Sequence, residues 1–435
     1  MIKFLESQKA RLATLRRWSL LSGQVAGMQV LVQGVSAITG LLLIRALPKE
    51  EYAWFTLAAS MLATLNLLAD GGISTALTSI GGRVYQDAPA FSRLLADGGR
   101  LAWRLGLVGV LLATPFFWHL YARLETPPAT AAWLIGLALL ATLPAITSTL
   151  LAVASRLHSR AGEVQMAELI SAGVRLLLTL GLLGLGWVEA RGFFAATLLA
   201  VLVQAAFLKR RTRIYTLPVP DARGHGREMG GFVRSLYANY LFFCVQGQVT
   251  TWIIGWLAGA QELADLGALS RLAVLFAALG APFAHLVTPS LARIQDPHVL
   301  RRRFALALGV VAVCILLLLA AAWWHPQVFL WLLGTKYAHL SNELLLALSA
   351  QGLSLSSGVC WGLIVVRGWV RHAWATIGTA LLGYACGAVF FPLDQVWGLL
   401  AFSIASNVPT LLFCLTVAGW KMTRDPIASK EARAG

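Results

Sequence analysis

Long apolar segments separated by short polar ones follow each other along the whole chain. Each apolar segment is long enough for a membrane-spanning helix, which needs about 17 to 25 residues. The apolar residues do not alternate with polar ones, and lipid leaves no water to satisfy the backbone, so helices are predicted. The expected fold class is all-α, a polytopic membrane protein with about twelve spans at residues 19–44, 52–80, 101–121, 130–154, 165–187, 192–208, 231–258, 263–288, 304–324, 341–366, 372–391 and 396–419.

Composition supports a membrane protein over a soluble one. Of the 435 residues, 58% are hydrophobic and only 12% are charged, whereas soluble domains carry about 25% charged residues. The first 17 residues are polar and basic, without the short apolar core and cleavage site of a signal peptide. The first apolar segment is therefore expected to stay in the bilayer.

Lys and Arg in the short loops predict the orientation, because they accumulate on the cytoplasmic side. With a cytoplasmic N-terminus, 26 of the 35 basic residues fall on that side and four fall within or beside spans. An even number of spans and two cytoplasmic termini are therefore predicted. This distribution also explains the net charge of +16 without a nucleic-acid partner. The opposite side holds only five basic residues: Arg45, Lys49, Arg123, Arg191 and Lys336.

Motifs of soluble enzymes are absent from the sequence. It contains no P-loop, no Rossmann glycine pattern, no HExxH and no GxSxG, so the chain is predicted not to be an enzyme, and no cofactor is expected. All five cysteines lie in apolar segments without a CxxC pair. They are interpreted as small buried side chains and not as metal ligands.

The longest predicted cytoplasmic loop divides the chain into halves of six spans. It covers about residues 209–230 and turns from basic to Pro- and Gly-rich. The predicted domains are an N-terminal bundle at 1–210, a linker at 211–230 and a C-terminal bundle at 231–435. Paired halves are common in transporters.

Polar residues inside spans are the candidate functional groups, because each costs about 2.5–3.5 kcal/mol at mid-bilayer unless it faces a cavity or a partner. In the fifth span, Glu168 and Arg175 are seven residues apart and share a helix face, with Gln165 one turn before Glu168. A polar stripe along a transport cavity, a structural ion pair with another helix and a position of Glu168 near the cytoplasmic interface all remain open. Asp70, before Gly71-Gly72, fits either a cavity acid at a hinge or a helix end.

The remaining candidates lie in other spans. Arg271 suits a diphosphate, because its planar fork donates paired hydrogen bonds to oxyanions. Arg45 either acts similarly or snorkels to the interface. Amides complete the set of cavity candidates: Asn239, Gln246, Gln248 and Asn407.

Several motifs together resemble the polysaccharide-transporter branch (O-antigen flippase-like) of the multidrug/oligosaccharidyl-lipid/polysaccharide (MOP) flippase superfamily. In that family an arginine, a turn with Pro and Glu, and a tyrosine follow the first span, and an Asp-Gly step lies in the second. The family often has an acidic residue midway along the seventh span. This chain has glutamines there, so it departs from the family pattern of an acid-based coupling site at that position. The motifs are residues 43–52 (LIRALPKEEY), 67–73 (LLADGGI), 257–260 (LAGA), 266–271 (LGALSR) and 289–294 (PSLARI).

The resemblance implies two six-helix bundles around a cavity that opens alternately to each side. It implies a substrate carried on undecaprenyl diphosphate, a lipid-linked oligosaccharide flipped across the bacterial inner membrane for O-antigen or exopolysaccharide synthesis. Membrane lipid and other polysaccharide-assembly proteins are the expected partners. Coupling to a proton or to a sodium ion stays open.

Three other functions compete with that of a lipid-linked oligosaccharide flippase. A multidrug or peptidoglycan-precursor exporter would share the fold. A membrane-embedded polysaccharide polymerase or ligase would need a sizeable external loop with catalytic residues, and the largest predicted one runs only from about 325 to 340. A structural scaffold does not account for charges inside the fifth and eighth spans.

The predicted topology can be tested with reporter fusions. A fusion at Gly435 should give a cytoplasmic signal and one near Glu125 a periplasmic signal, because the basic loops hold the two termini inside. A periplasmic signal at Gly435 would contradict the even number of spans.

Overall fold

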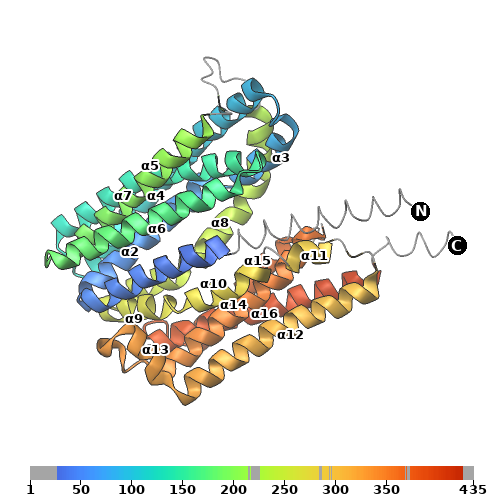
Figure 1. Ribbon diagram of the computed structural model, residues 1–435. Coiled ribbons are helices and arrows are strands. Elements are labelled where there is room, and N and C mark those ends of the chain that lie inside the picture. The colour runs from blue at the N-terminus through green and yellow to red at the C-terminus, as the bar shows by residue number, and fades with distance from the viewer. Residues whose placement is uncertain are drawn as a thin grey trace, which may run out of the picture.

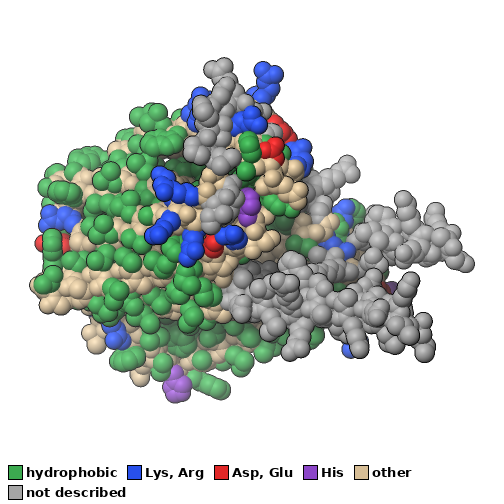
Figure 2. Space-filling view, turned by 45° about the horizontal axis from the view of Figure 1, so that its top comes forward, with side chains coloured by type: hydrophobic (Ala, Val, Ile, Leu, Met, Phe, Trp, Pro, Cys, Tyr) green, Lys and Arg blue, Asp and Glu red, His purple; other side chains and the backbone are tan. Residues whose placement is uncertain are grey.

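The structure is a computed structural model that describes residues 27–213, 216, 226–283, 287–292, 294, 296–367, 369 and 373–424. Every regular element within these ranges is helical, and nine of the described helices are long and apolar enough to cross a membrane. Exposed apolar side chains cover most of the surface visible in Figure 2, as expected for contact with lipid. The all-α, polytopic prediction is thereby confirmed.

The N-terminal half contains the following helices in order: Gly27–Ala46, α2 Lys49–Asp70, α3 Ile73–Val84, α4 Ala88–Arg123, α5 Pro128–Leu157, α6 Ala161–Gly184 and α7 Ala190–Thr212.

The C-terminal half continues with shorter and longer helices: α8 Gly226–Leu257, α9 Ala260–Ser270, α10 Ala273–Pro282, α11 Thr288–Ala292, α12 Pro297–Trp324, α13 Pro326–Leu333, the 3₁₀ helix η2 Thr335–Tyr337, α14 Ser341–Val366, α15 Ala373–Phe390 and α16 Val396–Arg424.

The helices form two groups that follow the two halves of the chain (Figure 1). In one, α2 packs on α4 and α5, and α7 packs on α5 and α6; in the other, α14 packs on α16 and α12, and α15 packs on α16. Helices α8 and α9 contact elements of both groups. A polar cavity at the boundary between the groups is therefore lined partly by α8 and α9.

Two predicted spans are broken helices. The second predicted span, at residues 52–80, breaks after Asp70. Gly71 and Gly72 there both have positive φ (45° and 97°), a conformation that glycine adopts without a steric penalty. The eighth predicted span, at residues 263–288, breaks at Arg271, between α9 and α10, with no glycine at the break. Residues 325–340, expected to be an external loop, contain α13 and η2 instead.

Helices α15 and α16 are in backbone contact at Gly383. A Cβ there would lie 2.4 Å from the carbonyl oxygen of Ala405 and 2.6 Å from Cα of Ser406. Contacts this short leave no space for a methyl group. Gly383 therefore sets how closely the two helices pack.

The Gly383→Ala variant is expected to lose about 1–3 kcal/mol of stability, because the added methyl group overpacks the α15–α16 contact. Gly378→Ala on the same helix is the matched control, since nothing lies within 4 Å of a Cβ there. It should be neutral or stabilising by up to about 1 kcal/mol, because alanine favours helix. Thermal unfolding of both purified variants in detergent makes the comparison, and equal stability would refute the backbone contact.

Candidate functional site

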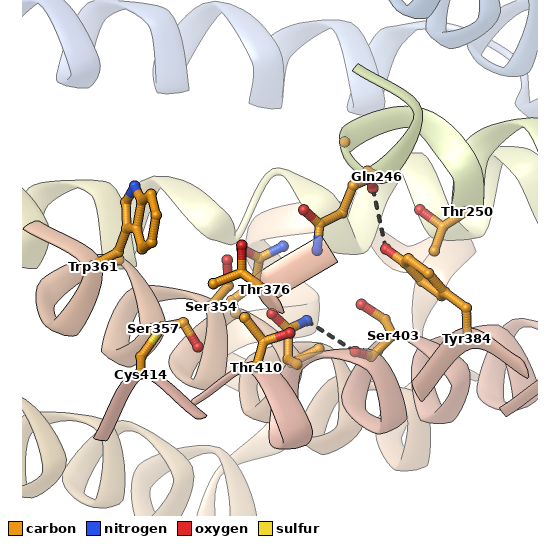
Figure 3. A pocket seen from close by; sticks show the side chains of 15 residues that line it. Gln246, Thr250, Ser354, Ser357, Trp361, Thr376, Tyr384, Ser403, Thr410 and Cys414 are labelled. Carbon is orange, nitrogen blue, oxygen red and sulfur yellow. Dashed lines mark hydrogen bonds between the residues drawn. The ribbon is translucent and has the colours of Figure 1, made fainter. Parts of the chain in front are cut away.

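A polar cavity of about 400 Å³ lies among α8, α14, α15 and α16 (Figure 3). Hydroxyl and amide side chains line it, with Trp361 and Tyr384 at its two ends in the view of Figure 3. The Tyr384 hydroxyl donates a hydrogen bond to the backbone oxygen of Gln246 at 3.5 Å, and Asn407 Nδ2 donates one to the oxygen of Ser403 at 2.8 Å. These bonds fix two side chains of the cavity wall.

A second cavity of about 360 Å³ adjoins the first and reaches the boundary between the two helix groups. It is lined by residues of α2, α8, α9, α14 and α16, together with Arg271. The two cavities adjoin and are together called the polar space, because they share five lining residues: Gly247, Thr250, Ala350, Gln351 and Ser403.

Four of the sequence candidates line this space. Gln246 and Asn407 line the first cavity, and Gln248 and Arg271 line the second. Ser60 of α2 donates a hydrogen bond to Oε1 of Gln248 at 2.6 Å, which joins α2 to α8. Asn239 belongs to α8, but its side chain lies outside the described part of the structure.

Arg271 is held by the first two helices of the chain. Its Nε donates a hydrogen bond to the Tyr52 hydroxyl at 3.1 Å, and that hydroxyl donates one to the oxygen of Gly267 at 3.2 Å. Gly40 leaves room for the side chain, since a Cβ there would lie 3.4 Å from Cδ of Arg271. The guanidinium group is thus fixed at the helix break.

In the described part of the chain, Arg175 of α6 is a second cation without an anionic partner. Its Nε is buried, with no hydrogen-bond partner among the described residues. Within the described ranges, neither Arg175 nor Arg271 forms an ion pair with a carboxylate. Of the two arginines, only Arg271 lines the second cavity.

Glu168 lies apart from Arg175, in a separate cavity of about 320 Å³ within the N-terminal group that Ser74 and Arg156 also line. Asp70 ends α2, and its carboxylate accepts hydrogen bonds from the backbone N–H and the hydroxyl of Ser74. Gln165 is buried near the start of α6. Glu168 and Arg175, which were predicted to belong to one polar stripe, therefore lie in different surroundings on α6.

Arg45 is exposed and points away from the polar space. Its Nε donates a hydrogen bond to the oxygen of Leu332 at 3.1 Å, and Nη2 donates one to the oxygen of Trp331. The guanidinium carbon also lies 4.7 Å from the Trp331 ring centroid. Arg45 caps the carbonyl end of α13, which joins the first helix to the C-terminal group.

An ion-paired cluster joins the two groups at the same end of the molecule. Asp265 of α9 is buried and pairs with Lys49 of α2 at 2.7 Å and with His339 Nε2 at 2.9 Å. Lys336 donates a hydrogen bond to the oxygen of Leu47. Burial lowers the pKa of Lys336 and nearby Lys49 lowers it further, while Glu50 raises it. The cluster holds α2 against α9 and the segment before α14.

Several lining residues were not among the sequence candidates. Trp361, Tyr384, Gln351 and Ser60 all line the polar space. One signal was available, because the middle of α14, between Leu348 and Gly358, carries five polar residues: Ser349, Gln351, Ser354, Ser356 and Ser357. Such a run is costly in lipid and indicates a wet face. Among the described residues, no group of three or more His, Cys, Asp or Glu is placed to hold a metal ion.

Comparison with solved structures shows the fold. The chain matches an inward-facing multidrug resistance MATE family transporter of the MOP superfamily with a TM-score of 0.70 and 14% identity, covering 93% of this chain and 96% of that one. An outward-facing structure of such a transporter matches with a TM-score of 0.64 at 14% identity, covering 94% and 96%.

A third match is a MOP superfamily transporter from Pyrococcus furiosus, with a TM-score of 0.65 and 15% identity over 94% of this chain and 96% of that one. Its binding pocket is described as reversed in polarity, which suggests a different function for it. No protein-family model and no curated protein sequence matches the chain. The chain is a multi-pass membrane protein whose fold is similar to that of the MATE transporters it matches.

Breaking the ion-paired cluster should open the end of the molecule that it holds. Asp265→Ala leaves Lys49 unpaired and is expected to cost about 1–3 kcal/mol, between the values for surface and buried pairs. A cysteine at Thr56, which lines the second cavity, should then react about tenfold faster with an impermeant thiol reagent added from the periplasmic side. Reaction rates of whole cells measure this.

Glu262→Ala is the matched control for Asp265→Ala. Glu262 lies on the same helix but accepts its hydrogen bond from Gly259, within its own segment. It should leave the Thr56→Cys rate unchanged. The double exchange Lys49→Asp with Asp265→Lys should restore slow labelling, and continued fast labelling in that variant would argue against the pair.

Proposed function

We propose that this chain is an alternating-access transporter that flips a lipid-linked oligosaccharide, carried on undecaprenyl diphosphate, from the cytoplasmic to the periplasmic leaflet of the bacterial inner membrane. The product would serve surface polysaccharide synthesis. The observation that carries the proposal is Arg271, which lines the second cavity, is held by the Tyr52 hydroxyl and has no carboxylate paired to it in the described ranges. An anionic substrate would supply the missing negative charge.

Electrostatics favours an anion with several oxygens at this position. A charge inside a membrane protein is costly unless it is paired, and like charges raise that cost. A diphosphate carries more than one negative charge, and its oxygens accept the paired hydrogen bonds that guanidinium groups donate. Binding it would supply the negative charge that Arg271 lacks among the described residues.

Both helix groups border the cavity that would hold the anion. The second cavity is lined by α2 of the N-terminal group and by α14 and α16 of the C-terminal group, together with Arg271. An anion bound at Arg271 would contact both groups, so its binding would favour the conformation in which they are close. This would couple substrate binding to the movement of one group against the other.

Two of the competing functions fit the site less well. A cationic drug would be repelled by Arg271. A peptidoglycan precursor carries the same diphosphate and differs only in its sugars and peptide, so Arg271 does not distinguish it from the proposed substrate. A polymerase or ligase would need catalytic groups, and no titratable carboxylate, His or Lys lines either cavity within the described ranges.

Substitution of Arg271 tests the proposal. Arg271→Ala should lower flipping at least about tenfold, because a charge-assisted hydrogen bond contributes about 1.5–3 kcal/mol. Arg271→Lys should retain partial activity, since it keeps the charge without the fork. Surface glycan is measured together with membrane protein level, in a strain whose own transporter has been deleted and which carries the variant.

Arg191→Ala is the control, because Arg191 pairs with Glu189 at the start of α7, away from both cavities. Its glycan level should stay normal. Normal glycan at a normal protein level in Arg271→Ala would remove Arg271 from the transport site. A fall in protein level alone would instead assign the arginine a structural role.

A further inference from the structure

The first cavity combines hydrogen-bonding capacity with an uncharged lining in the described part of the structure. The 15 described residues that line it are all uncharged, and they include serine and threonine hydroxyls, three amides and two large aromatic side chains. Its volume of about 400 Å³ lies in the range of small-ligand sites. This chemistry differs from that of the adjoining cavity, which contains Arg271.

We propose that the first cavity is a subsite for uncharged sugar residues, so that the glycan transported by this chain bears no acidic or cationic group in the part that enters it. The inference rests on the proposed function and specifies the substrate class of the same polar space. The diphosphate would occupy the cavity beside Arg271, and the sugars attached to it would extend into the first cavity.

The hydrogen-bonding groups match sugar hydroxyls. Hydroxyls and amides both donate and accept, as sugar hydroxyls do. Ser357 lines the cavity, and its Oγ is buried with no hydrogen-bond partner among the described residues. An unpaired buried hydroxyl is destabilising, and rotation of this side chain toward a ligand hydroxyl would satisfy it. Asn407 is already oriented by its bond to the oxygen of Ser403.

The aromatic side chains match the other surface of a sugar. A pyranose ring presents C–H groups on its faces, and these pack against an apolar ring. Trp361 and Tyr384 offer such faces at the two ends of the cavity in Figure 3, with the hydroxyl and amide groups between them. Tyr384 is held by Phe402, with ring centroids 4.8 Å apart. Rigid aromatic side chains bind with little loss of conformational entropy.

The same cavity disfavours charged sugars. A carboxylate or ammonium group entering it would lose water without gaining an opposite charge, and an unpaired buried charge is strongly unfavourable. A site of neutral hydrogen-bonding groups thus discriminates by charge as well as by shape. Uronic acids and sugars with free amines would be excluded from this part of the substrate.

Cysteine protection tests the subsite. In a variant without the native cysteines, Ser354→Cys places one thiol at an exposed position in the first cavity, and Ser270→Cys places one in the second. The probes are maltotriose, which is neutral, trigalacturonate, which is acidic, and inorganic pyrophosphate. The rate of modification by a small thiol reagent is measured for each purified protein, with gel filtration to verify folding.

Maltotriose at millimolar concentration should slow modification of Ser354→Cys, and trigalacturonate at equal concentration should not. Trp361→Leu should raise the maltotriose concentration needed for half-maximal protection about tenfold. Trp374 is an exposed tryptophan of α15 that does not line the cavity, so Trp374→Leu should leave that concentration unchanged. Ser357→Ala should weaken protection severalfold, whereas Ser356→Ala should not, because Ser356 already bonds to the oxygen of Gly352.

Equal protection by the two trisaccharides, or none by maltotriose, would overturn the neutral-sugar subsite. Pyrophosphate at Ser270→Cys separates that failure from a failure of the proposed function. If pyrophosphate protects Ser270→Cys while maltotriose fails at Ser354→Cys, the subsite is wrong and the anion-based function stands. If maltotriose protects and pyrophosphate does not, the subsite is supported and the diphosphate function is not.

Discussion

A bilayer offers the peptide backbone no hydrogen bonds, and every element of this structure is arranged around that constraint. Helices satisfy their own backbone, so an interruption is tolerated only where other parts of the protein cover it. Both broken spans obey this rule. The first break is covered by Tyr237, which would contact a Cβ at Gly71, and the second by Tyr52, which binds Arg271.

The same breaks position the polar chemistry. Asp70 ends α2, and Arg271 follows the last turn of α9, where a positive charge interacts favourably with the helix dipole. A continuous helix through residue 271 would have left no free end there. The break therefore stabilises a cation inside the protein, and the Tyr52 hydroxyl holds it toward the first helices. The cavity chemistry depends on this local interruption.

Hydropathy was sufficient to predict the helical, membrane-spanning fold, because length and lack of alternation are local properties of the sequence. Gly71 and Gly72 likewise marked one break. No glycine marks the break at Arg271. Helix α13 lies in a segment whose ends are polar, so the sequence predicted a loop there. These features depend on packing between distant segments, such as the contact of Arg45 with a carbonyl 287 residues away.

The candidate site was predictable only in part for the same reason. Gln246, Gln248, Arg271 and Asn407 were identified because a polar side chain within an apolar helix is conspicuous. Glu168 and Arg175 share a helix face, yet their distance along it places them in different surroundings. Arg45 and Arg271 have the same side chain, and only the tertiary structure separates a cap on α13 from a cation in the polar space.

The close approach at Gly383 has a mechanical meaning for the cavity. With backbone atoms in direct contact, α15 and α16 have no layer of side chains between them that could slide or shear. The two helices therefore pack as one unit of the cavity wall, in which α15 carries Tyr384 and α16 carries Ser403 and Asn407. The spacing of this part of the cavity wall is therefore set by backbone contact and not by the packing of side chains.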